Sequence, residues 1–332
     1  MLNRREFLIT ATGSLAASLL GACARLQAPR PETAAPVADL ERLFESFTAD
    51  ILRKDPELVT NLGLDHGEYA WVKSELTDVS LERRQQNIRD NAERLRRLHA
   101  IDRDSLPAAA LANYDTVEFQ LQTLAQAARF PYGNGPLPYV VTQLMGSYEA
   151  IPTFLDRQHA IRNEQDAQAY LARLRAFARV LDQETECIRH DAGQGVVPPD
   201  FIIDRTLEQL RAFRAIAPAE SVLVTSIVTR TRELGISGDY ETQAIRLVEQ
   251  EVYPAIERQI AELQRLRADA VHDAGIHRLP DGEALYQVAL RFFTTTDMTA
   301  REIHELGRAQ AEELAARMDA ILRSQGLTEG PV

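Results

Sequence analysis

Two segments contain histidines beside acidic residues, which are residue types that bind zinc. Neither segment has the full spacing of a zinc site. His304-Glu305 begins like a helix-borne zinc motif, which needs a second histidine four residues later so that both rings face one way. That position is Arg308, so the pattern favours a polar helix surface. His272-Asp273 and His277 lie in a segment typical of a turn, where spacing defines no common face. A surface loop is the favoured interpretation there.

Cys187 and His190 are three residues apart on a predicted helix, so both side chains could touch one ion. Zinc normally takes three or four protein ligands, and the sequence offers no partners for this pair. We therefore predict no metal site, and Cys187 is expected to be a small core residue. The sequence also lacks a G-x-S-x-G nucleophile elbow and a phosphate-binding glycine loop. No catalytic residue can be named from these patterns.

The N-terminal residues have the pattern of an export signal. Arg4-Arg5 is followed by the apolar stretch Ile9–Ala22, which is shorter than the roughly 20 residues needed to span a bilayer. Residues 1–22 thus resemble a twin-arginine signal peptide. Leu20-Gly-Ala-Cys23 resembles a lipobox, in which Cys23 receives lipid and becomes the mature N-terminus. The alternative is a buried N-terminal helix with an incidental cysteine.

Residues 23–38 are rich in proline and have no apolar periodicity, which predicts a disordered tether. Such a tether would hold a folded body away from the membrane to which lipid on Cys23 attaches it. Ala24 is not the aspartate typical of inner-membrane retention. The expected location is the periplasmic face of the outer membrane, or the periplasm.

The charge balance argues against binding to nucleic acid. The formal net charge is −12, and the signal peptide contributes +1 from Arg4, Arg5 and Glu6. The rest of the chain is therefore near −13, whereas a nucleic-acid binder presents a basic face to the phosphates. After Cys23, Cys187 is the only cysteine, so no disulfide within the chain is expected.

The remaining residues, 39–332, predict one all-α domain of about ten helices in one or two layers. Apolar residues recur at spacings of three and four almost throughout. The long helices from residue 163 onward could form a second layer. Residues 130–138, rich in glycine and proline, predict a loop. Residues 139–148 are uncharged between Tyr139 and Tyr148, and they could form a short strand or a buried turn of helix.

Local signals place many of the helix starts and one kink. Candidate starts are Asp55-Pro56, Ser80, Pro107, Pro152, Asn163, Pro218 and a capping box formed by Thr299 and Glu302. Pro254 should kink the long helix predicted over residues 239–270, because proline removes a backbone donor.

Several segments occur in an order and spacing that is similar to a known family. They are Val140-Val-Thr-Gln-Leu-Met-Gly146, Asp166-Ala-Gln-Ala-Tyr-Leu-Ala-Arg-Leu174, Gly195-Val-Val-Pro-Pro-Asp-Phe201, Val252-Tyr-Pro-Ala255, Leu279-Pro-Asp-Gly282, Tyr286, Thr294-Thr-Thr296 and Glu302-Ile-His-Glu-Leu-Gly307. From about residue 39 onward, the chain resembles the N-terminal half of the bacterial proteins called the domain of unknown function 885 family.

The resemblance implies an all-helical, zincin-like hydrolase, with peptidase activity on a peptide substrate expected. It also implies that the metal motif, a His-Glu pair followed by Pro-Gly-His-His, lies in a C-terminal half. Neither that motif nor the later Glu-Gly-Trp-Ala segment occurs in this sequence. Zinc is therefore expected only together with a C-terminal half, because a zinc hydrolase needs the metal ligands and a base to activate water.

Two hypotheses follow. The favoured one is the N-terminal half of a hydrolase, inactive alone, which binds a C-terminal half or self-associates. The alternative is a non-catalytic helical lipoprotein that acts in binding or assembly. The first predicts excess exposed apolar area along the last helix, at Ile303, Leu306, Ala309, Leu314, Met318 and Ile321. Residues 139–148 should border the same opening, with Gln143, Tyr148 and His304 as substrate-side candidates.

Overall fold

The computed structural model describes residues 35–327 and 329–330, and within them the fold is all-α, as predicted. There are twelve α-helices, α2 to α13, and the only β-pairing in the described chain is two isolated bridges. The helices are α2 (Ala35–Lys54), α3 (Pro56–Asn61), α4 (Leu81–Leu98), α5 (Ala108–Ala127), α6 (Ser147–Arg157), α7 (Glu164–Gly193), α8 (Asp200–Ala215), α9 (Val222–Glu233), α10 (Tyr240–Leu247), α11 (Tyr253–Arg267), α12 (Gly282–Thr294) and α13 (Ala300–Ser324).

The export residues Arg4, Arg5 and Cys23 lie outside the described residues, as does most of the predicted tether. The tether as predicted is four residues too long, because α2 begins at Ala35 rather than after residue 38. Pro36 is compatible with this start, since the first turn of a helix does not need its missing N–H. Within the described chain, no helix has the length and apolar character required to cross a bilayer.

Side-chain caps begin several helices where the sequence predicted them. Asp55, Ser80 and Asn163 each accept a hydrogen bond from a backbone N–H in the first turn of the helix that follows. Thr299 and Glu302 form the predicted reciprocal capping box at the start of α13. These bonds satisfy donors that have no partner inside the helix, and they need only neighbouring residues.

Two proline signals were interpreted wrongly. Pro152 does not open α6 but lies inside it, because the helix begins at Ser147, whose backbone N–H is bound by Glu184 of α7. Pro218 opens only a 3-10 turn, and Ser221 caps the helix α9 that follows. The kink predicted at Pro254 falls where the helix type changes. A π-helical turn, Val248–Val252, separates α10 from α11, and Pro254 is the second residue of α11.

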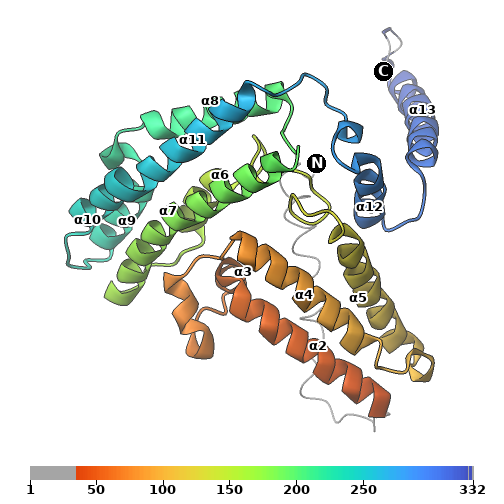
Figure 1. The fold of residues 1–332 in the computed structure, drawn as a ribbon, viewed down its shortest axis with the longest axis horizontal. Helices are drawn as coiled ribbons and strands as arrows, with labels where there is room; N and C mark the ends of the chain where they lie inside the picture. Colours follow the sequence, from red (N-terminus) through yellow and green to blue (C-terminus); the bar gives the residue numbers. More distant parts are fainter. Residues whose placement is uncertain (1–34, 328, 331–332) are drawn as a thin grey trace.

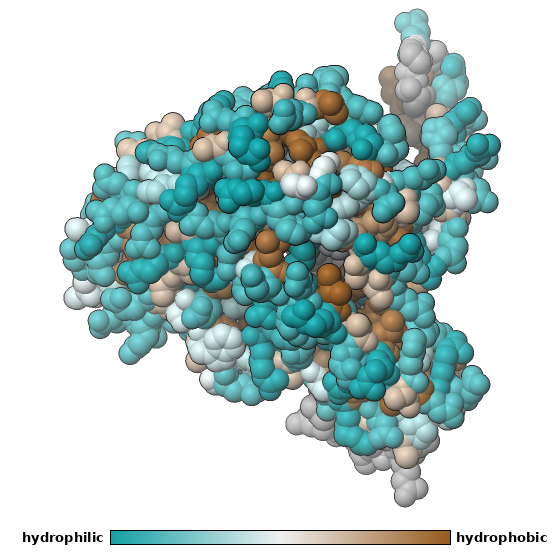
Figure 2. All heavy atoms as spheres, in the orientation of Figure 1, coloured by the Kyte–Doolittle hydropathy of each residue, from teal (hydrophilic) through white to brown (hydrophobic). Residues whose placement is uncertain are grey.

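The helices form two groups with separate cores, as Figure 1 shows. Helices α6 to α11 pack around the largest apolar core, with the long helix α7 at its centre. Helices α2, α4 and α5 pack around a second core. A small cluster joins the loop after α5 to α12, and α13 extends beyond it. The surface in Figure 2 is mostly hydrophilic, in keeping with the high content of charged residues.

Candidate functional site

The segment predicted as a strand or a turn of helix contains a tight turn followed by the start of α6. Thr142 and Met145 exchange two backbone hydrogen bonds, with N···O distances of 2.9 and 3.3 Å. Leu144 stands at the tip of this turn with 79% of its side chain exposed. Gly146, at a φ of +137°, then redirects the chain into α6, a conformation that side chains rarely adopt. A buried side chain, Tyr148, contacts the turn through its hydroxyl, which reaches the carbonyl oxygen of Thr142.

The substrate-side candidates Gln143 and Tyr148 both belong to this region. The hydroxyl oxygen of Tyr148 lies 2.6 Å from Oε1 of Gln209 and 2.9 Å from the carbonyl oxygen of Thr142. Burial raises the pKa of Tyr148 to about 12, so it is a neutral hydrogen-bonding group at ordinary pH. Oε1 of Gln143 is buried and has no hydrogen-bond partner among the described residues.

Beneath the turn lies Glu184, a carboxyl group that the sequence reasoning missed. Its Oε1 accepts hydrogen bonds from the backbone N–H and the hydroxyl of Ser147, at 2.8 and 2.7 Å. Its Oε2 lies 3.4 Å from Nε2 of Gln259, a fully buried side chain of α11. Burial raises the pKa of Glu184 to about 7 despite these three donors. A group that titrates near neutrality is a marker of functional sites.

A sequence signal for Glu184 did exist. Residues at positions 174, 177, 181, 184, 188 and 191 repeat at the three- and four-residue spacing of a buried helix face, and all six are buried. Four of them are apolar, and the other two are Glu184 and Asp191. A carboxylate on such a face requires partners from other elements, so both positions could have been selected as candidates.

Asp191 holds three segments together. It accepts hydrogen bonds from both Nη atoms of Arg84, at 2.7 and 3.2 Å, and from the backbone N–H of Gly133, at 2.9 Å. These bonds join α7 to α4 and to the loop 130–138. Only glycine fits at position 133, since a Cβ there would lie 2.1 Å from the carbonyl oxygen of Leu137. The loop is confirmed, and its shape depends on this buried carboxylate.

In the structure, Cys187 and His190 have different partners. The thiol of Cys187 is buried, lies 3.4 Å from the carbonyl oxygen of Val79, and has its pKa raised by burial to about 11. His190 instead places Nδ1 3.0 Å from Oδ1 of Asp191. Cys187 is thus the core residue that the sequence predicted.

The two histidines of the turn region also contact different residues. His272 lies 2.9 Å from Asp200, and His277 lies 3.3 Å from Asp273. Within residues 35–327, no three His, Cys, Asp or Glu side chains are arranged to hold a metal ion. The described donors therefore do not fit the zinc centre that the family resemblance implies.

His304, the third substrate-side candidate, is exposed on α13, and Figure 1 shows α13 apart from α6 and α7. No residue of α13 is buried. The exposed fractions are 46% for Leu306, 52% for Leu314, 52% for Met318 and 62% for Ile321. The excess of exposed apolar area predicted for this helix is therefore present.

Tyr139 packs against the cluster that includes α12, so residues 139–148 begin beside the helix that leads into α13.

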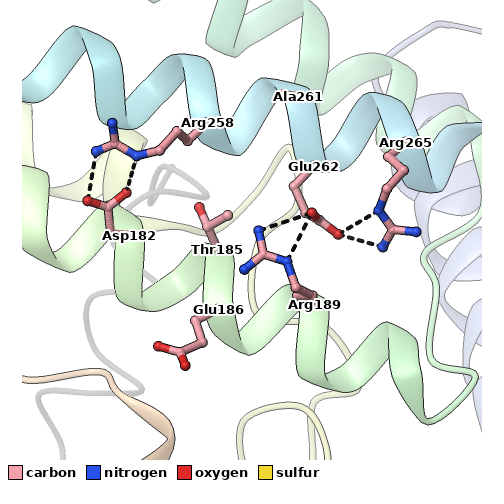
Figure 3. Close-up of a pocket in the computed structure, with 8 residues that line it drawn as sticks. All are labelled: Asp182, Thr185, Glu186, Arg189, Arg258, Ala261, Glu262 and Arg265. Atoms are coloured by element: carbon pink, nitrogen blue, oxygen red, sulfur yellow. Dashed lines mark hydrogen bonds and ion pairs between the residues drawn. The ribbon is translucent and has the colours of Figure 1, made fainter.

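A shallow charged groove of about 490 Å³ runs between α7 and α11 (Figure 3). Arg258 binds both carboxylate oxygens of Asp182 at 2.8 Å, and Glu262 accepts bonds from Arg189 and Arg265. Because these charges neutralise one another, they chiefly link the two helices. At 100° per residue, Asp182 and Glu184 point in directions about 160° apart around α7. The groove that Asp182 lines is therefore on the opposite side of that helix from the Glu184 side chain.

Fold and side chains together define the class of this protein: an all-α protein whose longest helix carries buried carboxylates that anchor neighbouring loops. Residues 56–331 match the family described as "Bacterial protein of unknown function (DUF885)", and the chain belongs to this family. A similar fold occurs in the crystal structure of "the putative lipoprotein from Colwellia psychrerythraea", with a TM-score of 0.82 and 21% sequence identity. The match covers 90% of this chain but only 53% of that one. Comparison with curated proteins found no match.

Proposed function

We propose that this chain is the helical scaffold of an exported, hydrolase-like member of its family, and that further polypeptide packs on α13. The observation that carries the proposal is the exposed apolar face of that helix. At 100° per residue, Leu306, Leu314, Met318 and Ile321 fall within an arc of about 120°. A helix with one apolar side normally buries it, and large exposed apolar patches mark interaction surfaces.

The comparison of lengths supports a covering segment from a larger fold. The chain spans about half of the Colwellia protein, while nearly all of the chain is matched. We infer that the polypeptide covering α13 corresponds to the part of that larger fold beyond the match. This covering half would also supply the zinc ligands and the base. Among the described residues, the His, Cys, Asp and Glu side chains that could bind zinc do not gather in groups of three or more. The chemistry that zinc would supply there is the activation of water for hydrolysis of a peptide.

In this proposal the described helices contribute substrate-side residues to a site that they would complete together with the covering half. Gln143 offers a buried amide oxygen without a partner, Tyr148 holds the turn, and His304 lies exposed on α13. We further propose that Arg4 and Arg5 direct export and that lipid on Cys23 attaches the protein to the periplasmic face of the outer membrane. The description of the Colwellia protein as a lipoprotein supports this placement.

A second candidate function is binding or assembly by a self-supporting helical lipoprotein. It is favoured by the three apolar clusters described above and by the buried carboxyl groups of Glu184 and Asp191, which find hydrogen-bond partners within the described chain. The two functions differ in what they predict for α13. The scaffold leaves an apolar face that binds dye or self-associates in solution, whereas a self-supporting protein is a monodisperse monomer that binds no dye.

The test is dye binding and sedimentation of the chain without its signal peptide. The proposal predicts binding of an apolar dye or self-association, both reduced by Leu314→Gln with Met318→Gln. Leu234→Gln is the matched control, because Leu234 is a similarly exposed leucine in a different part of the fold. A monodisperse wild-type monomer that binds no dye would favour the binding or assembly function. Association lost only with the α13 changes would identify a second copy as an occupant of this face.

Metal content tests the chemistry separately. We expect the chain to purify without stoichiometric zinc, because the described donor pairs are too few for a zinc site. Near-equimolar zinc retained through dialysis would contradict this, if it were lost on replacing His272 and His277, or Cys187 and His190.

A further inference from the structure

We propose that Glu184 is a proton-dependent anchor, which holds the start of α6 and the Thr142–Met145 turn when protonated and loosens them when ionised. The geometry carries this inference, and it does not depend on what covers α13. Among the described side chains, Glu184 alone binds both the backbone N–H and the hydroxyl of Ser147. Ser147 is the first residue of α6 and precedes Tyr148, whose hydroxyl reaches Thr142.

Among the residues that the structure describes, no positive charge is paired with an ionised Glu184. The neighbouring titratable groups are Tyr148 from α6 and Cys187 from α7, and burial raises the pKa of each well above neutrality. The side chains that reach toward the region from α8 and α11 are the uncharged amides of Gln209 and Gln259. A buried carboxylate without a cationic partner is costly, because hydrogen bonds replace only part of its lost hydration.

The protonated form has a suitable acceptor close by. Gln259 is fully buried, its Nε2 is 3.4 Å from Oε2 of Glu184, and its Oε1 has no partner among the described residues. That N···O distance is longer than the 2.7–3.2 Å of ordinary hydrogen bonds, so it stabilises the ionised form weakly. Turning the amide by about 180° would place its oxygen against Oε2, where a protonated Glu184 can donate to it.

Ionisation should therefore weaken the anchor as the pH rises through neutrality. The pKa of Glu184 is about 7 in the folded chain, against an ordinary value of 4.5. A raised pKa contributes stability that is complete below the ordinary value and is lost as the pH rises through about 7. If the opened segment has the ordinary pKa, linkage predicts about a tenfold increase in its opening between pH 6 and pH 8.

The test is amide hydrogen exchange over residues 140–157, expressed as protection factors at pH 6 and pH 8. Wild type should lose about tenfold in protection at pH 8, and Glu184→Gln should remove this pH dependence. Glu186→Gln is the matched control, because Glu186 is exposed on the same helix and its replacement should leave the wild-type behaviour unchanged. An equal pH dependence in Glu184→Gln, or none in wild type, would overturn the proposal.

A second variant keeps the test decisive if Glu184→Gln does not fold. Ser147→Ala retains the carboxyl group but removes the hydroxyl that lies 2.7 Å from it. Since this hydroxyl stabilises the ionised form, the midpoint of the pH-dependent loss of protection should move to higher pH. A midpoint that stays in place in Ser147→Ala would show that another group titrates, and the proposal would be wrong.

Discussion

Replacing Arg173 by methionine should remove a fully buried polar link between α7 and the segment that joins α3 to α4. Arg173 has no exposed surface. Its guanidinium donates to the carbonyl oxygens of Glu75 and Val72, at 3.0 and 2.9 Å, and to Oγ1 of Thr60, at 2.7 Å. It also lies 2.9 Å from Nδ1 of His159. Methionine would preserve much of the apolar contact of the stem and leave these acceptors without a donor.

The expected loss of unfolding free energy follows from the number of buried acceptors that are left without a hydrogen-bond donor. A buried acceptor without a donor costs about 1–3 kcal/mol, and this change leaves two carbonyl oxygens and one hydroxyl without the Arg173 donor. We expect a decrease of about 3–5 kcal/mol in the free energy of unfolding for Arg173→Met, the low end of that sum, because the change also removes a buried charge. This is a large share of the roughly 5–15 kcal/mol that stabilises a typical protein.

The measurement is urea unfolding followed by far-ultraviolet circular dichroism. Arg175→Met is the matched control on the same helix, because the Arg175 side chain is 66% exposed and lies 3.5 Å from Glu251. An exposed pair of this kind contributes at most about 1 kcal/mol. If the two variants unfold within about 1 kcal/mol of each other, Arg173 is not the link that its contacts indicate, and the reasoning is refuted.

Three further predictions test other parts of the chain. Burial lowers the pKa of His159 from 6.5 to about 4, so its stabilising contribution is complete above pH 6.5 and is lost as the pH falls toward 4; an imidazole that titrates near 6.5 by NMR would contradict this. The buried thiol of Cys187 should react with a thiol reagent only after urea unfolding, and immediate stoichiometric labelling of the native chain would show otherwise. For export, Cys23→Ser should release the protein into a soluble periplasmic fraction and Arg4-Arg5→Lys-Lys should block its passage, while unchanged membrane fractionation of Cys23→Ser would rule out lipid attachment.

The sequence by itself determined the features that depend on near neighbours. The caps at Ser80 and Asn163 and the capping box at Thr299 could be predicted, because each involves a side chain and a backbone group within three residues. The proline signal at Pro254 is also local, since a missing N–H acts within one turn, and a π-helical turn lies just before it. The apolar stripe of α13 also followed from spacing along a single helix.

Only the tertiary structure decided where the polar groups of the core find partners. Glu184 binds Ser147 from 37 residues away, and this contact starts α6 there although Pro152 suggested a later start. Glu184 and Asp191 interrupt an apolar face in the sequence, but that pattern names neither Gln259 nor Gly133 as the partner. The physical reason is distance along the chain: periodicity records which face of a helix is buried, whereas a buried charge is stabilised by groups that only folding brings within hydrogen-bond reach.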